Sequence, residues 1–268
     1  MAKSSSKGRI MPVLFVGHGT PMNAIEDNEF SGHWRELGKS LPWPDAILCI
    51  SAHWETSGTL VSAMEKPRTI HDFSGFPQEL FGVQYPASGS LWLASVIQEI
   101  IKSARVDFDQ EWGLDHGCWS VLKRMYPQAD VPVVQLSLDY NMQAGGHYLL
   151  ARELSSLRQQ NVLIIGSGNM VHNLQRMVLK GSDFNRPFGL DWAIEANELF
   201  KRLIHEGRHK ELINYQTLGK SVQLAVPTVE HYLPMLYILA LKEAGETVTY
   251  FNDKPVAGSL TMTSFVIQ

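Results

Sequence analysis

The segment NVLIIGSG, residues 161–168, is a short apolar run that ends in small residues. Runs of this length and composition are typical of buried strands in α/β sheets. The segments MPVLFVG at 11–17 and DAILCIS at 45–51 have the same form, and VPVVQLSL at 131–138 is a fourth candidate strand. Residues 247–268 are expected to form two more strands, antiparallel at a sheet edge.

Helical patterns alternate with these strands. The stretch 88–104 repeats apolar residues at helical spacing and has serines available as N-caps. Helices are also expected at 144–160 and at about 188–206 and 232–244. The alternation predicts a single α/β domain over residues 11–268, with a mostly parallel or mixed central sheet flanked by helices. Residues 1–10 are expected to be a flexible tail, and 57–88 a long, functional loop.

The composition narrows the class of protein. The chain has 268 residues, 44% of them hydrophobic, and a formal net charge of −4 without a cluster of lysine or arginine. This argues against a nucleic-acid partner and against a polybasic membrane patch. No apolar run reaches about 18 residues, so no membrane span is expected. Only Cys49 and Cys118 are present, too few for a disulfide framework, so we expect a cytoplasmic protein.

Four histidines occupy positions where ligands collect in α/β proteins. His18, His53 and His172 follow predicted strands, and the carboxyl ends of strands in open α/β sheets are the usual location of ligands. If the first two strands are parallel neighbours, His18 and His53 would reach one ion. Neutral imidazole is a common ligand of transition metals. A histidine after a strand can equally be a hydrogen-bonded loop residue, and the pattern alone leaves both readings open.

The fourth histidine stands in PTVEHYLP, residues 227–234. Pro234 is tolerated only in the first turn of a helix, which places Glu230 and His231 near a helix start. A side chain there can point into a cleft, so this pair could supply a third ligand. His116, in GLDHGCW at 113–119, is a further candidate, although that run could simply be a turn.

Other common motifs are absent or incomplete. The GSG at 166–168 lacks the third glycine of a dinucleotide-binding fingerprint. The chain has no Gly-x-Ser-x-Gly elbow and no His-Glu-x-x-His helix, which argues against serine hydrolases and the common zinc proteases.

Seven ordered motifs resemble the class III extradiol ring-cleavage dioxygenases, most closely the 4,5-DOPA extradiol dioxygenase branch. They run from about Pro12 to the C-terminus, and Thr20 stands where members commonly have serine. The motifs are GHGTPM at 17–22, SAHW at 51–54, TIHDFSGFP at 69–77, QYPASG at 84–89, GLDHGCW at 113–119, GSGNMVHNL at 166–174 and PTVEHYLP at 227–234.

The resemblance implies a buried metal cleft at the carboxyl ends of the strands, in which a catechol is opened with dioxygen. The substrate would be L-DOPA, cleaved at the 4,5 position, or a related catechol. One divalent metal per chain would be held by His18, His53 and His231, with Glu230 as the alternative third ligand and His172 as an extra ligand for zinc. Activity would require Fe(II), whereas zinc, which has no redox chemistry, could occupy the protein as isolated.

The resemblance also implies roles for other residues. His172, with an ordinary imidazole pKa of about 6.5, would act as acid and base, and His116 would hydrogen-bond the diol. The substrate ring would be walled by a loop that carries His71, Phe73, Phe76 and Tyr85. Three alternatives stay open: a zinc-dependent hydrolase on the same fold, a chelatase that inserts metal into a tetrapyrrole, and a non-catalytic metal-binding protein. The sequence leaves the oligomeric state unknown.

Overall fold

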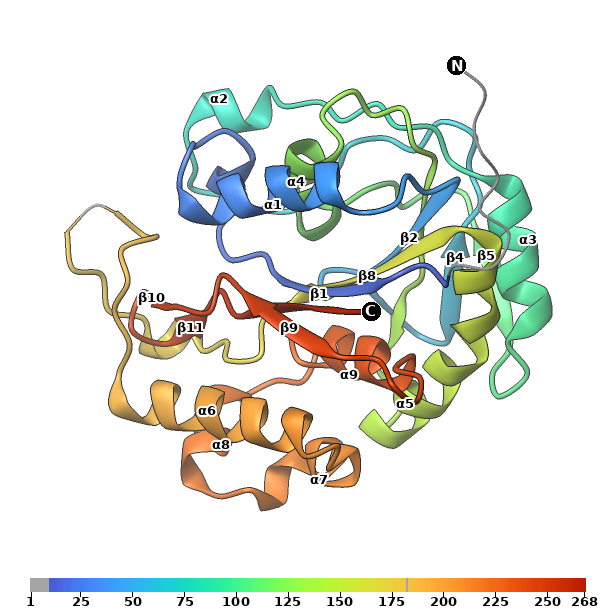
Figure 1. Ribbon diagram of the computed structural model, residues 1–268. Helices are drawn as coiled ribbons and strands as arrows, with labels where there is room; N and C mark the ends of the chain where they lie inside the picture. Colours follow the sequence, from blue (N-terminus) through green and yellow to red (C-terminus); the bar gives the residue numbers. More distant parts are fainter. Residues whose placement is uncertain (1–9, 182) are drawn as a thin grey trace.

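A six-stranded mixed sheet organises the protein in a computed structural model, which describes residues 10–181 and 183–268 (Figure 1). The order of the strands is β6-β2-β8-β1-β12-β9. β6, β2, β8 and β1 are parallel, whereas β12 runs antiparallel to both of its neighbours, β1 and β9. The bounds are β1 Val13–Gly17, β2 Ala46–Ser51, β6 Val133–Gln135, β8 Val162–Gly168, β9 Val248–Phe251 and β12 Ser264–Ile267. The predicted α/β class with a mixed sheet is confirmed.

The position of β8 corrects one prediction. β8 pairs with β2 on one side and with β1 on the other, so β1 and β2 are not neighbours. The register Val13↔Ile164 and Leu48↔Ile164 places one residue of β8 opposite both strands. All seven residues of β8 are buried, as expected of a central parallel strand covered on both faces. β9 at the edge and β12 inside it form the expected antiparallel pair, but residues 247–268 also contain two short strands, Pro255–Val256 and Leu260–Thr261, which pair with each other.

Alternate residues of each strand pack into two different hydrophobic cores, because successive side chains point to opposite faces of a sheet. Val13 and Phe15 of β1 join the core under α5, α6 and α9, whereas Leu14 and Val16 join the core under α1 and α4. Figure 1 shows these helix groups on opposite sides of the sheet. The bounds are α1 Glu29–Ser40, α4 His116–Met125, α5 Ala144–Glu153, α6 Asp191–His205 and α9 Leu233–Ala240.

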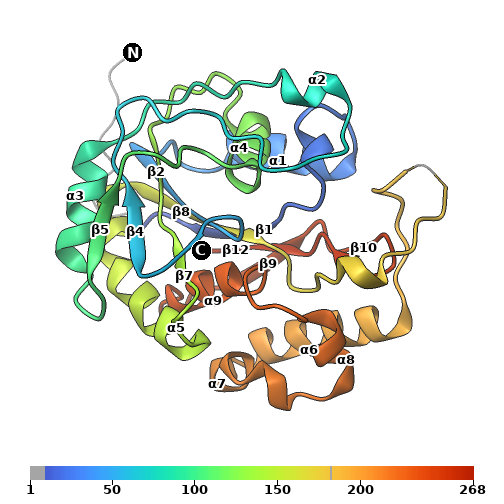
Figure 2. The ribbon, with the colours of Figure 1, turned by 180° about the vertical axis from the view of Figure 1, so that it is seen from behind.

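Shorter elements complete the structure. From behind, α3 lies beside β4 and β5 at one end of the sheet, and α6, α7 and α8 lie together beyond α9 (Figure 2). The remaining bounds are α2 Gln78–Phe81, α3 Leu91–Ile100, α7 His209–Ile213, α8 Lys220–Ala225, β3 Glu55–Thr56, β4 Thr59–Ser62, β5 Val106–Asp109, β7 Leu138–Asp139, β10 Pro255–Val256 and β11 Leu260–Thr261.

Three expectations about local structure need correction. The segment 57–88 is not irregular throughout, because β4 pairs in parallel with β5 and a short α2 follows. The helix expected at 144–160 stops at Glu153 and continues as a 3-10 helix, Leu154–Gln160. The segment 131–138 splits into β6 and β7. The tail expected at 1–10 lies outside the described residues except for Ile10, and the domain bounds 11–268 stay a prediction.

Within the described part of the chain, none of the helices combines the length and the hydropathy needed to cross a membrane.

Candidate metal centre

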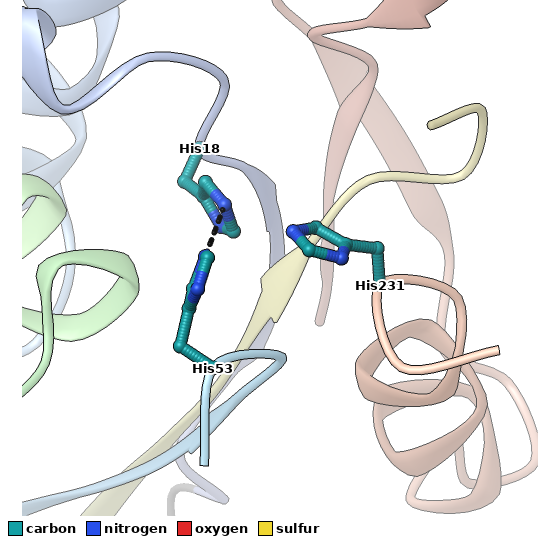
Figure 3. Close-up of side chains that lie close together, drawn as sticks. All are labelled: His18, His53 and His231. Atoms are coloured by element: carbon teal, nitrogen blue, oxygen red, sulfur yellow. Dashed lines mark hydrogen bonds between the residues drawn. The ribbon is translucent and has the colours of Figure 1, made fainter. Parts of the chain in front are cut away.

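Three histidines that are far apart in the sequence meet at the carboxyl end of β8. His18 directly follows β1, His53 lies two residues after β2, and His231 lies in the turn before α9. Figure 3 shows the three imidazoles turned toward one another. One ring nitrogen from each lies within 4.8 Å of the other two. The sequence reasoning is correct that these residues come together, but His18 and His53 do so across the end of β8.

Backbone hydrogen bonds tie each histidine segment to the end of β8. They run from His18 N to Gly168 O at 3.1 Å, from Ala52 N to Ser167 O at 2.9 Å and from Asn169 N to His231 O at 2.9 Å. A regular strand therefore fixes the three backbones, and the site is built on rigid elements.

Two glycines of β8 allow the start of α9 to approach the strand. A Cβ atom at Gly168 would lie 2.2 Å from the carbonyl oxygen of His231, and one at Gly166 would lie 2.4 Å from that of Pro234. Non-bonded carbon and oxygen atoms cannot approach so closely, so only glycine permits this packing. The GSG run therefore serves helix packing in this fold.

The hydrogen bonds of His18 define which ring nitrogen carries the proton. Its Nδ1 lies 3.0 Å from the hydroxyl oxygen of Ser167, and that hydroxyl donates to the carbonyl of Gly117 at 2.6 Å. Because the only hydroxyl hydrogen of Ser167 is used, the oxygen accepts from His18, whose Nδ1 is protonated. Its Nε2 is left as a lone-pair donor.

Carboxylates fix the same tautomer in the other two rings. His53 Nδ1 lies 3.3 Å from Asp72 Oδ2, and His231 Nδ1 lies 3.1 Å from Glu230 Oε1. An ionised carboxylate can only accept hydrogen bonds, so each carboxylate favours the tautomer that carries the hydrogen on Nδ1 and leaves the lone pair on Nε2. Ligating histidines in metalloproteins commonly have this arrangement.

The three free Nε2 atoms fit a metal ion. The Nε2 atoms of His18 and His53 are only 3.1 Å apart (Figure 3). In this tautomer neither can donate to the other, and the two lone pairs need a shared cation. His231 Nε2 is buried and has no hydrogen-bond partner among the described residues. An orphaned buried acceptor is rare unless a ligand completes it.

The imidazoles are kept neutral, which is the form that binds metals. Burial, and then the proximity of the other imidazoles, lowers the pKa of His18 and of His231 well below the ordinary value. Burial, together with nearby His116, lowers the pKa of His53 to about 3. The site is therefore ready for a cation at neutral pH.

Glu230 lies on the far side of the His231 ring from the shared centre. Its Oε1 accepts from His231 Nδ1 and from the hydroxyl of Thr228, at 2.8 Å. The two neighbours thus diverge, as the 3.6-residue helical period suggests for adjacent positions. Glu230 therefore contacts Nδ1 of His231 and leaves Nε2 of that ring free.

His172 stacks directly on His231. The two ring centroids are 3.6 Å apart and the planes differ by 7°. Its backbone N–H donates to Ala225 O at 2.9 Å, so its position is fixed. Burial lowers the pKa of His172 to about 4, well below the ordinary value expected from the sequence. The ring is therefore a neutral proton acceptor at pH 7.

Asp72 is a site residue that the sequence reasoning missed. Its Oδ2 accepts from His116 Nδ1 at 2.9 Å and lies 3.3 Å from His53 Nδ1, and its Oδ1 accepts from the backbone N–H of His116 at 2.9 Å. Burial raises the pKa of this carboxyl, but the hydrogen bonds and the nearby imidazoles outweigh burial and hold the pKa below its usual value. Its place in TIHDFSGFP was the available signal.

A cavity of about 650 Å³ opens beside the histidines. All five histidines described above line it, together with Phe73 and Phe76 from the predicted loop. The sequence did not predict most of its apolar wall, whose residues lie mainly outside the predicted strands and helices: Met22, Leu174, Met177, Leu179, Phe184 and Leu260.

Two residues expected to wall the substrate ring lie elsewhere, which corrects that prediction. Tyr85 is buried in the core, and its hydroxyl donates to Tyr126 O at 3.1 Å. His71 Nε2 donates to Val83 O at 3.0 Å. Neither lines the cavity, because each side chain is held by a backbone carbonyl away from it.

Known proteins share both the sequence and the fold. Residues 12–253 match the family described as the catalytic LigB subunit of aromatic ring-opening dioxygenase. The chain belongs to this family. A relative from Escherichia coli (strain K12), named 4,5-DOPA dioxygenase extradiol, is 45% identical over 261 residues, which cover 96% of this chain and 94% of the relative. A relative from Beta vulgaris with the same name is 38% identical over 248 residues, 90% of each chain.

A crystal structure agrees with this membership in the ring-opening dioxygenase family. It is that of an uncharacterized protein from Escherichia coli K12, with a TM-score of 0.83 at 39% sequence identity, covering 96% of this chain and 100% of that one. The resemblance drawn from the ordered motifs is confirmed. The chain is therefore a dioxygenase, and its histidine cluster is able to hold a metal.

Proposed function

We propose that this dioxygenase opens the ring of a catechol by extradiol cleavage, with 4,5-cleavage of L-DOPA or a related catechol as its reaction. The observation that carries the proposal is the convergence of three lone-pair Nε2 atoms, one of them buried without a partner, at the wall of an aromatic-lined cavity. The relatives named 4,5-DOPA dioxygenase extradiol support the substrate.

His18, His53 and His231 would hold one divalent metal per chain. When bound there, the metal supplies a Lewis acid for the two catechol oxygens and, as Fe(II), the redox chemistry that a reaction with dioxygen requires. Three nitrogen ligands also suit zinc, which would occupy the protein as isolated without supporting turnover. With zinc, His172 would serve as an extra ligand, since its ring stacks on His231 and lines the same cavity.

The other residues would bind the catechol and move its protons. His172 is neutral and lines the cavity, so it would accept a proton from a catechol hydroxyl and return it later. His116 gives its Nδ1 hydrogen to Asp72, which leaves Nε2 as an acceptor for the diol. Phe73 and Phe76 would contact the ring and exclude water.

Anaerobic reconstitution with Fe(II), followed by oxygen-electrode assays against a panel of catechols, tests the proposal. We expect oxygen uptake with L-DOPA or a simpler catechol and a yellow ring-opened product. A matched zinc-loaded sample should be inactive. Equal turnover with zinc, or hydrolysis of an ester or peptide in place of oxygen uptake, would establish the hydrolase alternative.

Metal content of purified variants tests the ligands separately. His18→Ala and His53→Ala should each lower bound metal well below one per chain without unfolding the domain. His231→Ala should lose metal, whereas Glu230→Gln should keep it. Full occupancy in both His18→Ala and His53→Ala would remove the assignment, and loss only in Glu230→Gln would restore a carboxylate ligand.

We also propose a cytoplasmic location. Both cysteines, Cys49 and Cys118, are buried and unpaired, the state expected in a reducing compartment.

A further inference from the structure

The cavity has an uneven distribution of charge. Its described lining includes two carboxylates, Glu26 and Asp183, and neither a lysine nor an arginine. Both carboxylates belong to exposed residues, whereas His231 is buried at the histidine end of the same cavity. A substrate bound at the histidines therefore meets negative charge at the solvent-exposed part of the cavity.

These two carboxylates are not neutralised by basic partners. Glu26 accepts one long contact from Asn185 Nδ2 at 3.4 Å, and Asp183 accepts from the backbone N–H of Asn185 at 2.9 Å. In the described chain no lysine or arginine nitrogen lies within 4.0 Å of either side-chain carboxylate, and the nearby Arg124 donates to the backbone carbonyl of Glu26 at 2.9 Å and to the carboxylate of Asp27. Their acidic neighbours differ, because Asp27 is paired with arginines and Glu29 with a lysine.

Three basic residues near Asp183 in the sequence add no positive charge to the cavity lining. Arg176, Lys180 and Arg186 are exposed, and none of them lines the cavity. Lys180 Nζ lies over the ring of Phe188, 3.5 Å from its centroid, and Arg186 donates to Lys180 O at 3.4 Å. The described lining thus offers no fixed cation to a carboxylate.

The rest of the wall is apolar. Met22, Phe76, Leu179 and Phe184 belong to the same lining as the histidines and the two carboxylates. Burying an ionised carboxylate on such a wall without a partner is unfavourable, whereas an ammonium group can reach Glu26 and Asp183. His231 Nε2, which is buried and has no hydrogen-bond partner among the described residues, lines the same cavity, so the metal centre and the two carboxylates face one ligand.

We propose that the cavity selects catechols whose side arm is neutral or ends in an ammonium group, with Glu26 and Asp183 as the ammonium site, and that it discriminates against arms ending in a carboxylate. This inference rests on the proposed catechol cleavage and adds the charge class of the substrate. L-DOPA, which carries both groups, would bind through its ammonium group and leave its carboxylate in solvent.

Three catechols with the same two-carbon arm test this selectivity: dopamine with an ammonium group, 4-ethylcatechol without a charge, and 3,4-dihydroxyphenylpropionate with a carboxylate. Titration calorimetry on Fe(II)-loaded protein without oxygen gives the dissociation constants. We expect dopamine to bind roughly 10-fold more tightly than 3,4-dihydroxyphenylpropionate. Each exposed charge interaction changes a dissociation constant by at most about 10-fold. The ratio should shrink at high salt.

A double variant, Glu26→Gln with Asp183→Asn, should reduce the ratio to below about 2-fold. The control Glu36→Gln with Glu99→Gln changes the net charge equally outside the cavity lining and should keep the wild-type ratio. Equal or tighter binding of the carboxylate, or a preference that survives in the double variant, overturns the inference.

Oxygen uptake with the same three compounds separates this inference from the proposed function. If all are cleaved without any order by charge, the selectivity is wrong and catechol cleavage stands. If none is bound or cleaved, both are wrong.

Discussion

Replacing Asp72 by asparagine should weaken metal binding although Asp72 would not contact the metal. The carboxylate accepts two hydrogen bonds from His116, one from its ring Nδ1 and one from its backbone N–H, and it lies 3.3 Å from the Nδ1 atom of His53. An amide has one oxygen and one NH₂ group, so it cannot accept at both ends. If its NH₂ faces the rings, His53 and His116 must move their protons to Nε2, and His53 can no longer bind a metal.

The distances indicate how large the effect should be. Loss of a carboxylate that orients a ligating histidine typically lowers metal affinity about 10- to 100-fold, or about 1.4–2.7 kcal/mol. The contact to His53 is long, at 3.3 Å, and the Asp72 side chain is 15% exposed, so we expect a value near the lower end. The contact to His116 is shorter, at 2.9 Å, so catechol affinity should fall as well.

Competition with a chelator measures the metal dissociation constant of wild type and of Asp72→Asn. Asp45→Asn, an exposed carboxylate outside the cavity lining, serves as the control and should leave the constant unchanged. Thermal unfolding of the metal-free proteins reports any general loss of stability separately. An unchanged metal constant in Asp72→Asn, or a loss fully explained by unfolding, would refute the positioning role.

Three further predictions follow from the site and its surroundings. Gly168→Ala should displace His231, because the new Cβ would lie 2.2 Å from the carbonyl oxygen of His231. We expect about 1–3 kcal/mol of destabilisation, and weaker metal binding measured by calorimetry. Gly32→Ala, where the space around the new Cβ is open, is the control. His172→Gln should retain Fe(II) and catechol while oxygen uptake falls roughly 10²–10⁴-fold; lost Fe(II) would make His172 a ligand, and unchanged turnover would leave it without a catalytic role. Burial lowers the pKa of His147, which is not one of the histidines of the metal centre, to about 4. Between about pH 6.5 and 4 the unfolded chain therefore binds more protons at this residue than the folded chain. The free energy of unfolding must fall as the pH is lowered through this window. The loss at His147 is on the order of 3 kcal/mol, and denaturant unfolding of metal-free His147→Gln should show a shallower pH dependence than wild type.

The strands and their terminal histidines could be predicted from local sequence. Buried parallel strands leave continuous apolar runs, and β1, β2 and β8 all do so. A histidine one or two residues after such a run must lie near the carboxyl end of its strand, so the positions of His18 and His53 could be predicted without a structure. Pro234 marked the start of α9 in the same way.

Strand order and side-chain direction could not be predicted, because both depend on contacts between distant segments. No local signal places β8 between β1 and β2, or pairs β4 with β5 across more than forty residues. Tyr85 and Phe73 stand in similar aromatic loops, yet one packs into the core and the other lines the cavity. Asp72 was overlooked because its role depends on His53 and His116, which lie beside it only in the folded chain.

The end of β8 links the fold to the chemistry through three adjacent small residues. Side chains alternate across a strand, so Gly166 and Gly168 face α9 and Ser167 faces the opposite side, toward Gly117. The glycines admit the segment that carries His231, and the serine fixes the tautomer of His18. A larger residue at Gly168 would displace His231, and an apolar residue at Ser167 would free the His18 ring to exchange its protonated nitrogen. The central strand thus has to end in small and polar residues because three histidines must meet at its carboxyl end. Two of them follow its flanking strands, and the third lies in the turn before the helix packed on it.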